Sequence, residues 1–498
     1  MSLSHIALGT WFTARADRTP DRRALTFEGR TATFREVADR VERFAAVLAD
    51  GGVTPGDRVA FLGFNQPAAL EVLMAAARLG AVYVSLNHRL AAEEIGFVLR
   101  DAGVHTAVVD ADHAPTLAAA SFAGRLLVVG EGYDEAIAAA APLAQHPVVQ
   151  PDDLAILMYT SGTTGTPKGV MLSHANLWWS TANLATQFDV LRDDVTLTMA
   201  PLFHIAGLNV TTLSTWLHGG EVVLHRSFDV DRVLDDIARY GVTTVFGVPA
   251  MFGMIERSPR FADADLGTVR MAICGGAPVP ESLLRSWLDK GIAMLQGYGL
   301  TETAPAASFL SADQALARLG SAGRPPLYVD LKLDDGGRPV TEPFERGEIC
   351  LRGANVTRGY WNRPDATAEA IDADGWFHTG DVGYRDEDGY LFVVDRLKDM
   401  VISGGENIYP AEVENVLYQH PAILEVAVVG LPDEEWGETV AAFVVLQEDA
   451  SLTLEELRAF AGERLARYKL PRRLEVVPLL PRNASGKVQK PHLRTQVC

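Results

Sequence analysis

Cysteine is scarce in this chain: its 498 residues include three, Cys274, Cys350 and Cys498, which lie far apart. An odd number at such wide spacing excludes a disulfide framework and the paired spacing of a zinc motif. Scattered thiols of this kind are typical of proteins in a reducing compartment, so we expect a cytoplasmic location.

Long apolar runs and an excess of positive charge are missing as well. No stretch approaches the roughly 20 uninterrupted apolar residues of a membrane-spanning helix, and the opening Met-Ser-Leu-Ser-His lacks the basic segment of a secretory signal. The net charge of −20 argues against a surface for nucleic acid or anionic membranes. The sequence therefore predicts a soluble intracellular protein with no membrane span. It leaves the oligomeric state open, with a homodimer as one option.

The hydrophobic pattern indicates an α/β fold with more than one domain. The composition is 48% hydrophobic, which supplies ample core, and the length suggests two or three domains. Up to about residue 320, helical and strand-like segments alternate, as in helix 34–49 and strand 58–63. This alternation is typical of parallel sheets covered by helices. We expect a large N-terminal domain over 1–395, with helix-covered sheets and a small β-structure, and a small α/β C-terminal domain over 396–498.

The most informative segment is 159–170, Tyr-Thr-Ser-Gly-Thr-Thr-Gly-Thr-Pro-Lys-Gly-Val. A backbone this rich in glycine can turn its N–H groups inward around an anion, and the hydroxyl groups and Lys168 add donors and charge. It is not a Walker P-loop, because Pro167 precedes the lysine and a strand is predicted to follow. The segment predicts a polyphosphate site, and the alternative is a surface hairpin. The candidate phosphate-binding residues are Thr160, Ser161, Gly162, Thr163, Thr164, Gly165 and Lys168.

Two further glycine turns each follow an apolar strand: Gly275-Gly276-Ala277-Pro278 and Gln296-Gly297-Tyr298-Gly299. Open α/β sheets bind ligands at the carboxyl ends of their strands, so both turns are candidate ligand sites. Tyr298 can stack on a flat base, and Glu302, which follows Thr301, can hold a hard cation such as Mg²⁺. Structural turns would explain the glycines but not an acid among threonine donors.

Three other residues could each act in binding or catalysis, but each also has an ordinary structural explanation. His204 lies alone in an apolar run, and it is either a core histidine or a wall of an apolar acid pocket. Asp381 follows a glycine turn, where it either accepts two ribose hydroxyl groups or caps the turn. Lys487 lies in a segment near the C-terminus, where a lone lysine is usually solvated.

The complete set, in this order and at these separations, resembles the acyl-adenylate-forming superfamily over about residues 10–490. That superfamily contains acyl-CoA synthetases, luciferases and the adenylation domains of peptide synthetases. The resemblance implies an AMP-forming acid–thiol ligase that uses ATP, Mg²⁺ and coenzyme A. A carboxylate would attack the α-phosphate of ATP, and coenzyme A would then displace AMP from the acyl-adenylate. The partners expected are a small carboxylic acid and coenzyme A.

The resemblance also implies roles for the candidate residues. Lys487 would bridge the substrate carboxylate and the α-phosphate, Thr301 would contact that phosphate, and Glu302 would bind Mg²⁺. A hinge at Lys398 would rotate the C-terminal domain between the two half-reactions. The residues implied to bind the nucleotide are Gly275, Gly276, Ala277, Pro278, Gln296, Gly297, Tyr298, Gly299, Asp381 and Arg396. Those implied to face coenzyme A after the rotation are Ser403, Gly404, Gly405, Glu406 and Trp436.

The identity of the acid is less sharply defined. Residues expected around the acyl group, among them His204, Phe246 and Val248, offer almost no fixed charge, so malonate would lack a cation for its second carboxylate. A fatty acid and an aryl-propenoate such as ferulate, coumarate or cinnamate remain. We favour a medium- or long-chain fatty acid, because no polar group for a phenol is evident. The rival functions are an adenylation module acting on a carrier protein, a luciferase-like oxygenase, and a non-catalytic acyl-nucleotide binding protein.

Overall fold

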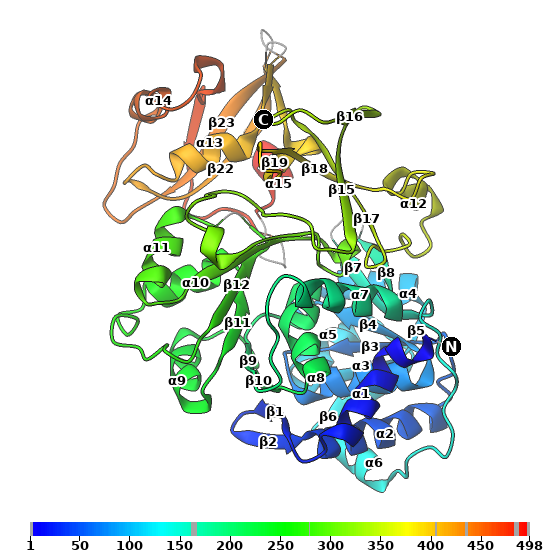
Figure 1. Cartoon of the computed structure of the whole chain (residues 1–498). Coiled ribbons are helices and arrows are strands. Elements are labelled where there is room, and N and C mark those ends of the chain that lie inside the picture. The colour runs from blue at the N-terminus through cyan, green and yellow to red at the C-terminus, as the bar shows by residue number, and fades with distance from the viewer. Residues whose placement is uncertain are drawn as a thin grey trace. The chain divides into compact units, whose positions relative to one another are not determined.

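A computed structural model of the chain describes residues 3–160, 167–277, 279–403, 406–433, 437–482 and 488–495. The chain forms two compact units, residues 1–331 with 351–377, and residues 332–350 with 378–498. Compactness does not locate a hinge, so the boundary at 395/396 and the hinge at Lys398 stay predictions. The α/β class expected from the sequence is confirmed by the helices and strands of Figure 1.

The first sheet of the larger unit has six strands in the order β6-β5-β3-β4-β7-β8. All neighbours are parallel except β8, which runs antiparallel to β7. All five residues of β4 are buried, because apolar clusters cover both faces of this sheet. The strands are β3 (Arg58–Leu62), β4 (Val82–Leu86), β5 (Val104–Asp110), β6 (Arg125–Val129), β7 (Leu154–Thr160) and β8 (Lys168–Ser173).

The second sheet has eight strands in the order β14-β13-β12-β11-β9-β10-β1-β2. The strands from β13 to β1 are parallel, and the two outer strands are antiparallel to their neighbours. Parallel strands place their carboxyl ends at one edge, which is where the two glycine turns lie. The strands are β1 (Arg23–Phe27), β2 (Arg30–Thr33), β9 (Val195–Thr198), β10 (Glu221–Leu224), β11 (Thr244–Gly247), β12 (Met271–Gly275), β13 (Met294–Tyr298) and β14 (Ser308–Leu310).

Helix boundaries in this unit follow local signals. α2 (Phe34–Asp50) begins after Thr33, which forms a capping box with Glu36. α3 (Pro67–Leu79) begins at a proline and ends at Gly80, whose φ is +67°. Both helices share a core cluster with α1 (Leu8–Arg18) and the first sheet, in the blue and cyan part of Figure 1. The other helices are η1 (Leu3–Ile6), α4 (Ala92–Ala102), η2 (Ala111–His113), α5 (Ala114–Ala119), α6 (Tyr133–Ala139), α7 (His174–Ala185), the π-helix η3 (Ala206–Leu213), α8 (Ser214–His218), α9 (Val230–Tyr240), α10 (Pro249–Glu256), α11 (Glu281–Asp289), η4 (Thr301–Thr303), η5 (Ala312–Gln314) and α12 (Pro364–Ala370).

Beyond residue 328 the strands form two further sheets, one in the order β16-β15-β17-β18-β19 and one in the order β21-β20-β23-β22 with β24 paired to β23. Alternate residues of β22 enter different clusters: Val428 packs with α13 and α14, whereas Ala427 and Val429 pack with α15. The elements are β15 (Val329–Asp335), β16 (Arg338–Val340), β17 (Gly347–Gly353), β18 (Phe377–Arg385), β19 (Leu391–Arg396), η6 (Leu397–Asp399), β20 (Val401–Ser403), β21 (Glu406–Ile408), α13 (Pro410–Leu417), β22 (Ile423–Asp433), β23 (Gly437–Leu446), α14 (Leu454–Gly462), η7 (Arg467–Lys469), β24 (Arg473–Val476) and α15 (Lys490–Thr495).

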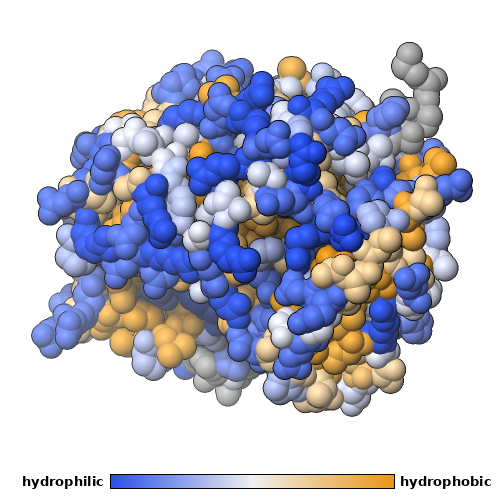
Figure 2. Space-filling view, turned by 90° about the horizontal axis from the view of Figure 1, so that it is seen from below, coloured by the Kyte–Doolittle hydropathy of each residue, from blue (hydrophilic) through white to orange (hydrophobic). Residues whose placement is uncertain are grey.

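Figure 2 shows one face covered mainly by hydrophilic residues, with apolar residues gathered in a few patches. Within the part of the chain that the structure describes, no helix has the length and hydropathy needed to cross a membrane.

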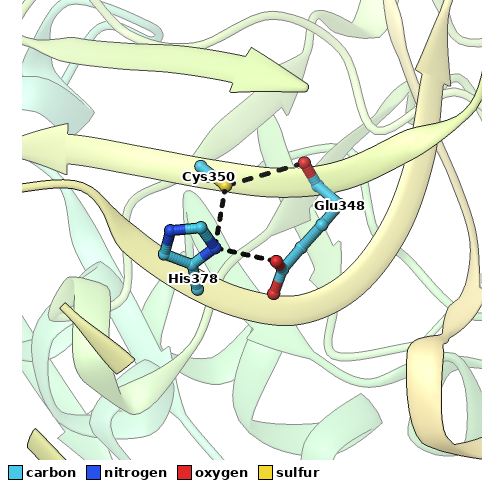
Figure 3. A group of neighbouring side chains, drawn as sticks. All are labelled: Glu348, Cys350 and His378. Atoms are coloured by element: carbon cyan, nitrogen blue, oxygen red, sulfur yellow. Dashed lines mark hydrogen bonds and ion pairs between the residues drawn. The ribbon is translucent and has the colours of Figure 1, made fainter. Parts of the chain in front are cut away.

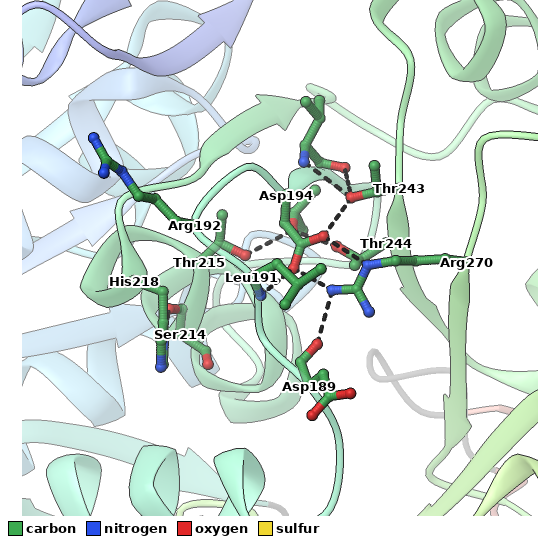
Figure 4. A network of polar contacts seen from close by, with 12 residues as sticks. Asp189, Leu191, Arg192, Asp194, Ser214, Thr215, His218, Thr243, Thr244 and Arg270 are labelled. Atoms are coloured by element: carbon green, nitrogen blue, oxygen red, sulfur yellow. Dashed lines mark hydrogen bonds and ion pairs between the residues drawn. The ribbon is translucent and has the colours of Figure 1, made fainter.

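A polar network joins the amino ends of β9, β11 and β12, which are neighbours in the second sheet (Figure 4). The Asp194 side chain is 2% exposed, and it accepts hydrogen bonds from Thr243 Oγ1 at 2.7 Å and from Arg270 Nε at 3.0 Å. Arg270 also donates to the backbone oxygen of Asp189 at 2.7 Å. A buried carboxylate is costly unless it is paired, so Arg270 stabilises Asp194 where the amino ends of the three strands meet.

We expect Arg270→Ala to lower the free energy of unfolding by about 2–3 kcal/mol, because Asp194 then loses the cation beside it. This is less than for a fully buried pair, since the Arg270 side chain is 31% exposed. Urea unfolding followed by tryptophan fluorescence measures the change. Arg260→Ala is the control, because the partners of Arg260 are exposed carboxylates and no measurable change is expected. Equal effects of the two variants would contradict this account.

Candidate active site

The glycine segment 159–170 joins two antiparallel strands. β7 ends at Thr160 and β8 begins at Lys168, and these two residues are partners across the pair. The strand predicted after the lysine is confirmed, and this separates the segment from a Walker P-loop, which runs into a helix. Residues 161–166 lie outside the described residues, so the roles of Ser161, Gly162, Thr163, Thr164 and Gly165 stay predictions.

Lys168 and Glu302 both contact one tyrosine. Tyr360 donates its hydroxyl to Glu302 Oε1 at 2.9 Å, and the Lys168 ammonium lies 5.2 Å from the centroid of the Tyr360 ring. Burial, with the charge of Glu302, raises the pKa of Tyr360 above its usual range, so the hydroxyl remains a donor. The structure thus brings the predicted phosphate segment and the predicted Mg²⁺ ligand together through a residue that the sequence interpretation missed.

The two glycine turns adjoin at the ends of β12 and β13. Gly275 and Gly297 are partners across these strands, and a Cβ on Gly275 would lie 2.7 Å from the Gly297 oxygen. Gly276 has a φ of +85°, a conformation that favours glycine. Gln296 is buried, Tyr298 is half-buried at the end of its strand, and Ala277 is exposed. Pro278 lies outside the described residues, and the nucleotide-binding roles of this group stay predictions.

Backbone contacts around η4 set the direction of Glu302. The Thr357 N–H donates to the Glu302 backbone oxygen at 2.7 Å, and the Leu300 N–H donates to Thr303 Oγ1 at 3.1 Å. Gly299 lies so close to Pro305 that a Cβ would be 1.5 Å from the Pro305 oxygen. Thr301 is half-buried, whereas the Glu302 residue is 9% exposed. The tight turn therefore presents a largely buried carboxylate to Tyr360.

His204 precedes the π-helix η3 and is half-buried, unlike an enclosed core histidine. Its ring lies 4.5 Å from the Phe203 ring, centroid to centroid, and its backbone oxygen accepts the Leu208 N–H at 3.0 Å. Ala206 and Phe246 belong to the apolar cluster on the adjacent face of β11–β14. The histidine thus contacts an aromatic ring and lies two residues before a member of this cluster, and its role in an acid pocket stays a prediction.

In the smaller unit, Asp381 and Arg396 are partners across β18 and β19. Arg396 Nε lies 3.2 Å from Asp381 Oδ1, and the Asp381 side chain is 8% exposed. The Asp381 N–H donates to Thr379 Oγ1 at 3.0 Å, which holds the turn before it. The two residues predicted to bind ribose are thus in contact, while that role stays a prediction.

Glu348, Cys350 and His378 form a compact group beside this turn (Figure 3). Glu348 Oε1 accepts the Gly380 N–H at 2.9 Å, and Glu348 Oε2 lies 2.8 Å from His378 Nδ1. Cys350 Sγ lies 3.4 Å from the same ring nitrogen and 3.7 Å from the Glu348 backbone oxygen. A nucleophilic triad uses both ring nitrogens of its histidine, so this group is not one.

The group instead supports the turn that presents Asp381. The atoms of this group that could bind a metal lie within 4.8 Å of one another, which is near enough for a cation. Hydrogen bonds within the group already engage these atoms. Glu348 is a second residue that the sequence interpretation missed, and its signal was a lone acid in the apolar strand β17.

The segments predicted to face coenzyme A also adjoin. Ser403, at the end of β20, pairs with Glu406 of β21 and with Gly437 of β23. Gly437 directly follows Trp436 in the chain. Residues Gly404, Gly405, Trp436 and Lys487 lie outside the described residues, as do the side chains of Lys398 and Glu406, so their roles stay predictions.

Two protein families match this chain. The AMP-binding enzyme family matches residues 12–361, and the AMP-binding enzyme C-terminal domain matches residues 412–487. The first match alone covers more than half of the chain and identifies it as an AMP-binding enzyme.

Individual relatives agree with this. A feruloyl-CoA synthase from an Amycolatopsis species is 47% identical over 98% of both chains. The long-chain-fatty-acid–CoA ligase FadD13 of Mycobacterium tuberculosis is 39% identical over 93% of both chains. The solved O-succinylbenzoate coenzyme A synthetase of Bacillus subtilis, in complex with ATP and a magnesium ion, has a TM-score of 0.89 and 37% identity over 98% of both chains. The chain therefore belongs to the acyl-adenylate-forming superfamily of AMP-binding enzymes and is an AMP-forming acid–thiol ligase.

Proposed function

We propose that this enzyme is an aryl-propenoate–CoA ligase. It joins an acid of the ferulate or cinnamate class to AMP, releases pyrophosphate, and transfers the acyl group to coenzyme A. The fatty acid favoured by the sequence interpretation becomes the second candidate, because the feruloyl-CoA synthase relative is 47% identical and the fatty-acid ligase 39%. The solved relative is named for succinylbenzoate, which is also an aromatic acid.

One observation carries the adenylation reaction: Lys168 and Glu302 both contact Tyr360. Lys168 would neutralise the β- and γ-phosphates of ATP, and Glu302 would hold Mg²⁺. The carboxylate fits this ion, because Mg²⁺ prefers oxygen ligands and the Tyr360 hydroxyl keeps Glu302 in one orientation. Mg²⁺, when bound, would offset negative charge on the phosphate oxygens.

The remaining residues would orient the two reactants. The substrate carboxylate is ionised at pH 7, so its attack needs no general base. Asp381 has acceptor oxygens for two ribose hydroxyl groups, and Arg396 holds it in place. Lys487 would stabilise the charge that develops on the α-phosphate oxygens. Rotation at Lys398 would then replace Lys487 by the Ser403–Glu406 side of the C-terminal domain, and such motions often limit turnover.

An aromatic acid suits the glycine-bearing face of β12 and β13. Gly275 and Gly297 are partners across these strands, and a Cβ on Gly297 would lie 3.0 Å from the Phe309 ring, so this aromatic ring packs directly against the glycine. Phe246 and Phe309 belong to the apolar cluster on this face. A planar ring can pack edge-to-face with phenylalanine, which a flexible alkyl chain does less well.

The test measures pyrophosphate release with ferulate, cinnamate, octanoate and palmitate, each with and without coenzyme A. We expect kcat/KM for ferulate or cinnamate to exceed the fatty-acid values by about tenfold or more. Faster turnover of the fatty acids would overturn the substrate assignment and leave the ligase assignment intact. Multiple turnovers that require free coenzyme A would exclude a module that loads a carrier protein.

The compartment and assembly belong to the same proposal. Cys274 and Cys350 are buried free thiols, which supports a reducing compartment such as the cytoplasm. A homodimer stays an option that analytical ultracentrifugation tests.

A further inference from the structure

A buried group of charges connects α15 with the predicted hinge. α15 begins at Lys490, whose Nζ lies 2.9 Å from Glu414 Oε1 of α13, and the two side chains are 15% and 17% exposed. Arg494 of the same helix lies 3.3 Å from Asp399 Oδ1, next to the hinge position. Lys490 also interacts with the charges of Asp395 and Asp399. The group therefore includes residues on both sides of residue 398.

Glu414 has a second partner that explains its position. In the described part of the chain β22 is the outer strand of its sheet, so its outward N–H groups face no neighbouring strand. Glu414 Oε1 accepts one of these groups, the Val428 N–H, at 2.7 Å. Burial raises the pKa of Glu414, while Lys490 and this hydrogen bond oppose the rise. Burial acts to lower the pKa of Lys490, but Glu414 and Asp395 raise it above its usual value. The ammonium therefore stays charged.

Asp395 reaches across the hinge position. It lies in β19, before residue 398, yet its Oδ2 accepts the N–H of Ala411, in the first turn of α13, at 2.7 Å. Burial raises the pKa of Asp395, and Lys490 opposes this rise. A carboxylate on one side of the hinge is thus bound by groups on the other side.

The chain is also held on both sides of the segment that contains Lys487. Arg482 and Val488 form an antiparallel bridge, and the Gln489 N–H donates to the Pro481 oxygen at 2.8 Å. Arg482 Nη2 lies 3.0 Å from Glu425 Oε2 of β22. The next anchor after the bridge is Lys490 itself. These contacts fix the chain at Pro481 and Arg482 and again at Val488 and Gln489.

We propose that Lys490, held by Glu414, is a positioning residue for adenylation: it sets the direction in which the chain presents Lys487 and links that direction to the hinge through Asp395. This inference rests on the role proposed above for Lys487. Stability alone does not require the charges, because apolar side chains of similar volume often replace a buried ion pair without loss. A charge-assisted hydrogen bond adds a defined geometry, and small misplacements of a catalytic group are costly.

The test separates geometry from stability by making the pair apolar. Lys490→Met is expected to slow pyrophosphate release by about tenfold or more, with thioester formation from supplied acyl-adenylate changed by less than about twofold. Lys490→Arg is expected to restore most of the rate. The double variant Glu414→Met, Lys490→Met removes both members of the pair, so it should recover most of the thermal midpoint lost in Lys490→Met but not the adenylation rate. Recovery of both the thermal midpoint and the adenylation rate in the double variant would overturn the proposal. Equal loss of the two half-reactions in Lys490→Met would overturn it as well.

Lys469→Met is the matched control, because Lys469 pairs with Glu412 of the same helix α13 and is 13% exposed, but does not flank residues 483–487. Hydrogen exchange of peptides spanning 478–494 needs no activity and should be faster in Lys490→Met than in Lys469→Met. Unchanged exchange in Lys490→Met would overturn the proposal whatever the enzyme does. Full pyrophosphate release by Lys487→Ala, or none by the unaltered enzyme with any acid, would instead refute the proposed function.

Discussion

Lys487→Ala is expected to reduce pyrophosphate release from ferulate and ATP by about 10²–10³-fold. The transition state of adenylation spreads negative charge over the α-phosphate oxygens, and a positioned ammonium stabilises that charge in a site from which water is excluded. The second half-reaction is a different displacement, in which the coenzyme A thiol displaces AMP from the acyl-adenylate. Thioester formation from supplied feruloyl-adenylate should therefore remain within about twofold of the unaltered enzyme, since the proposed rotation would withdraw Lys487 in that state.

The two half-reactions are measured separately, pyrophosphate release by a coupled phosphate assay and thioester formation by the absorbance of feruloyl-CoA. Lys487→Arg tests the geometry: it keeps the charge but replaces a point charge with a planar fork, and an intermediate rate is expected. Lys469→Ala controls for the loss of any lysine in this unit. Equal loss of both half-reactions in Lys487→Ala would refute its assignment to adenylation.

Glu302→Gln is expected to lower pyrophosphate release by about 10²-fold at low Mg²⁺ and by less at high Mg²⁺. The substitution keeps the size of the side chain and an oxygen that accepts from Tyr360, but it removes the charge that would hold the cation. The Mg²⁺ concentration at half-maximal rate should rise accordingly, and a titration at fixed ATP measures it.

Tyr360→Phe is the matched comparison, because it removes the 2.9 Å hydrogen bond to Glu302 but leaves the carboxylate. A hydrogen bond of this kind contributes about 1.5–3 kcal/mol. If the bond only orients Glu302, the rate of pyrophosphate release should fall by at most about 10- to 100-fold. An unchanged Mg²⁺ requirement in Glu302→Gln would exclude Glu302 as the ligand.

Elements whose signals are local could be predicted from the sequence. The strand after Lys168, the helix that begins at Pro410 and the strands that precede Gly276 and Gly299 all follow from apolar spacing and turn residues. The π-helix over 206–213 could not be predicted, because its apolar run fits a strand or an ordinary helix equally well. The substrate class could not be predicted for a related reason: the absence of a fixed charge does not separate an alkyl chain from an aromatic ring.

The sequence by itself determined the superfamily, the order of the glycine turns and the residue types available for phosphate and cation chemistry. Turns and residue types depend on neighbouring residues, so spacing is enough to recognise them, and the superfamily follows from the resemblance of the complete motif set. Only the tertiary structure decided that Tyr360 joins Lys168 to Glu302, that Glu348 supports the turn before Asp381, and that Lys490 pairs with Glu414. These contacts join residues far apart in the chain, and which of many similar tyrosines, carboxylates and lysines meet depends on strand order and on packing between elements.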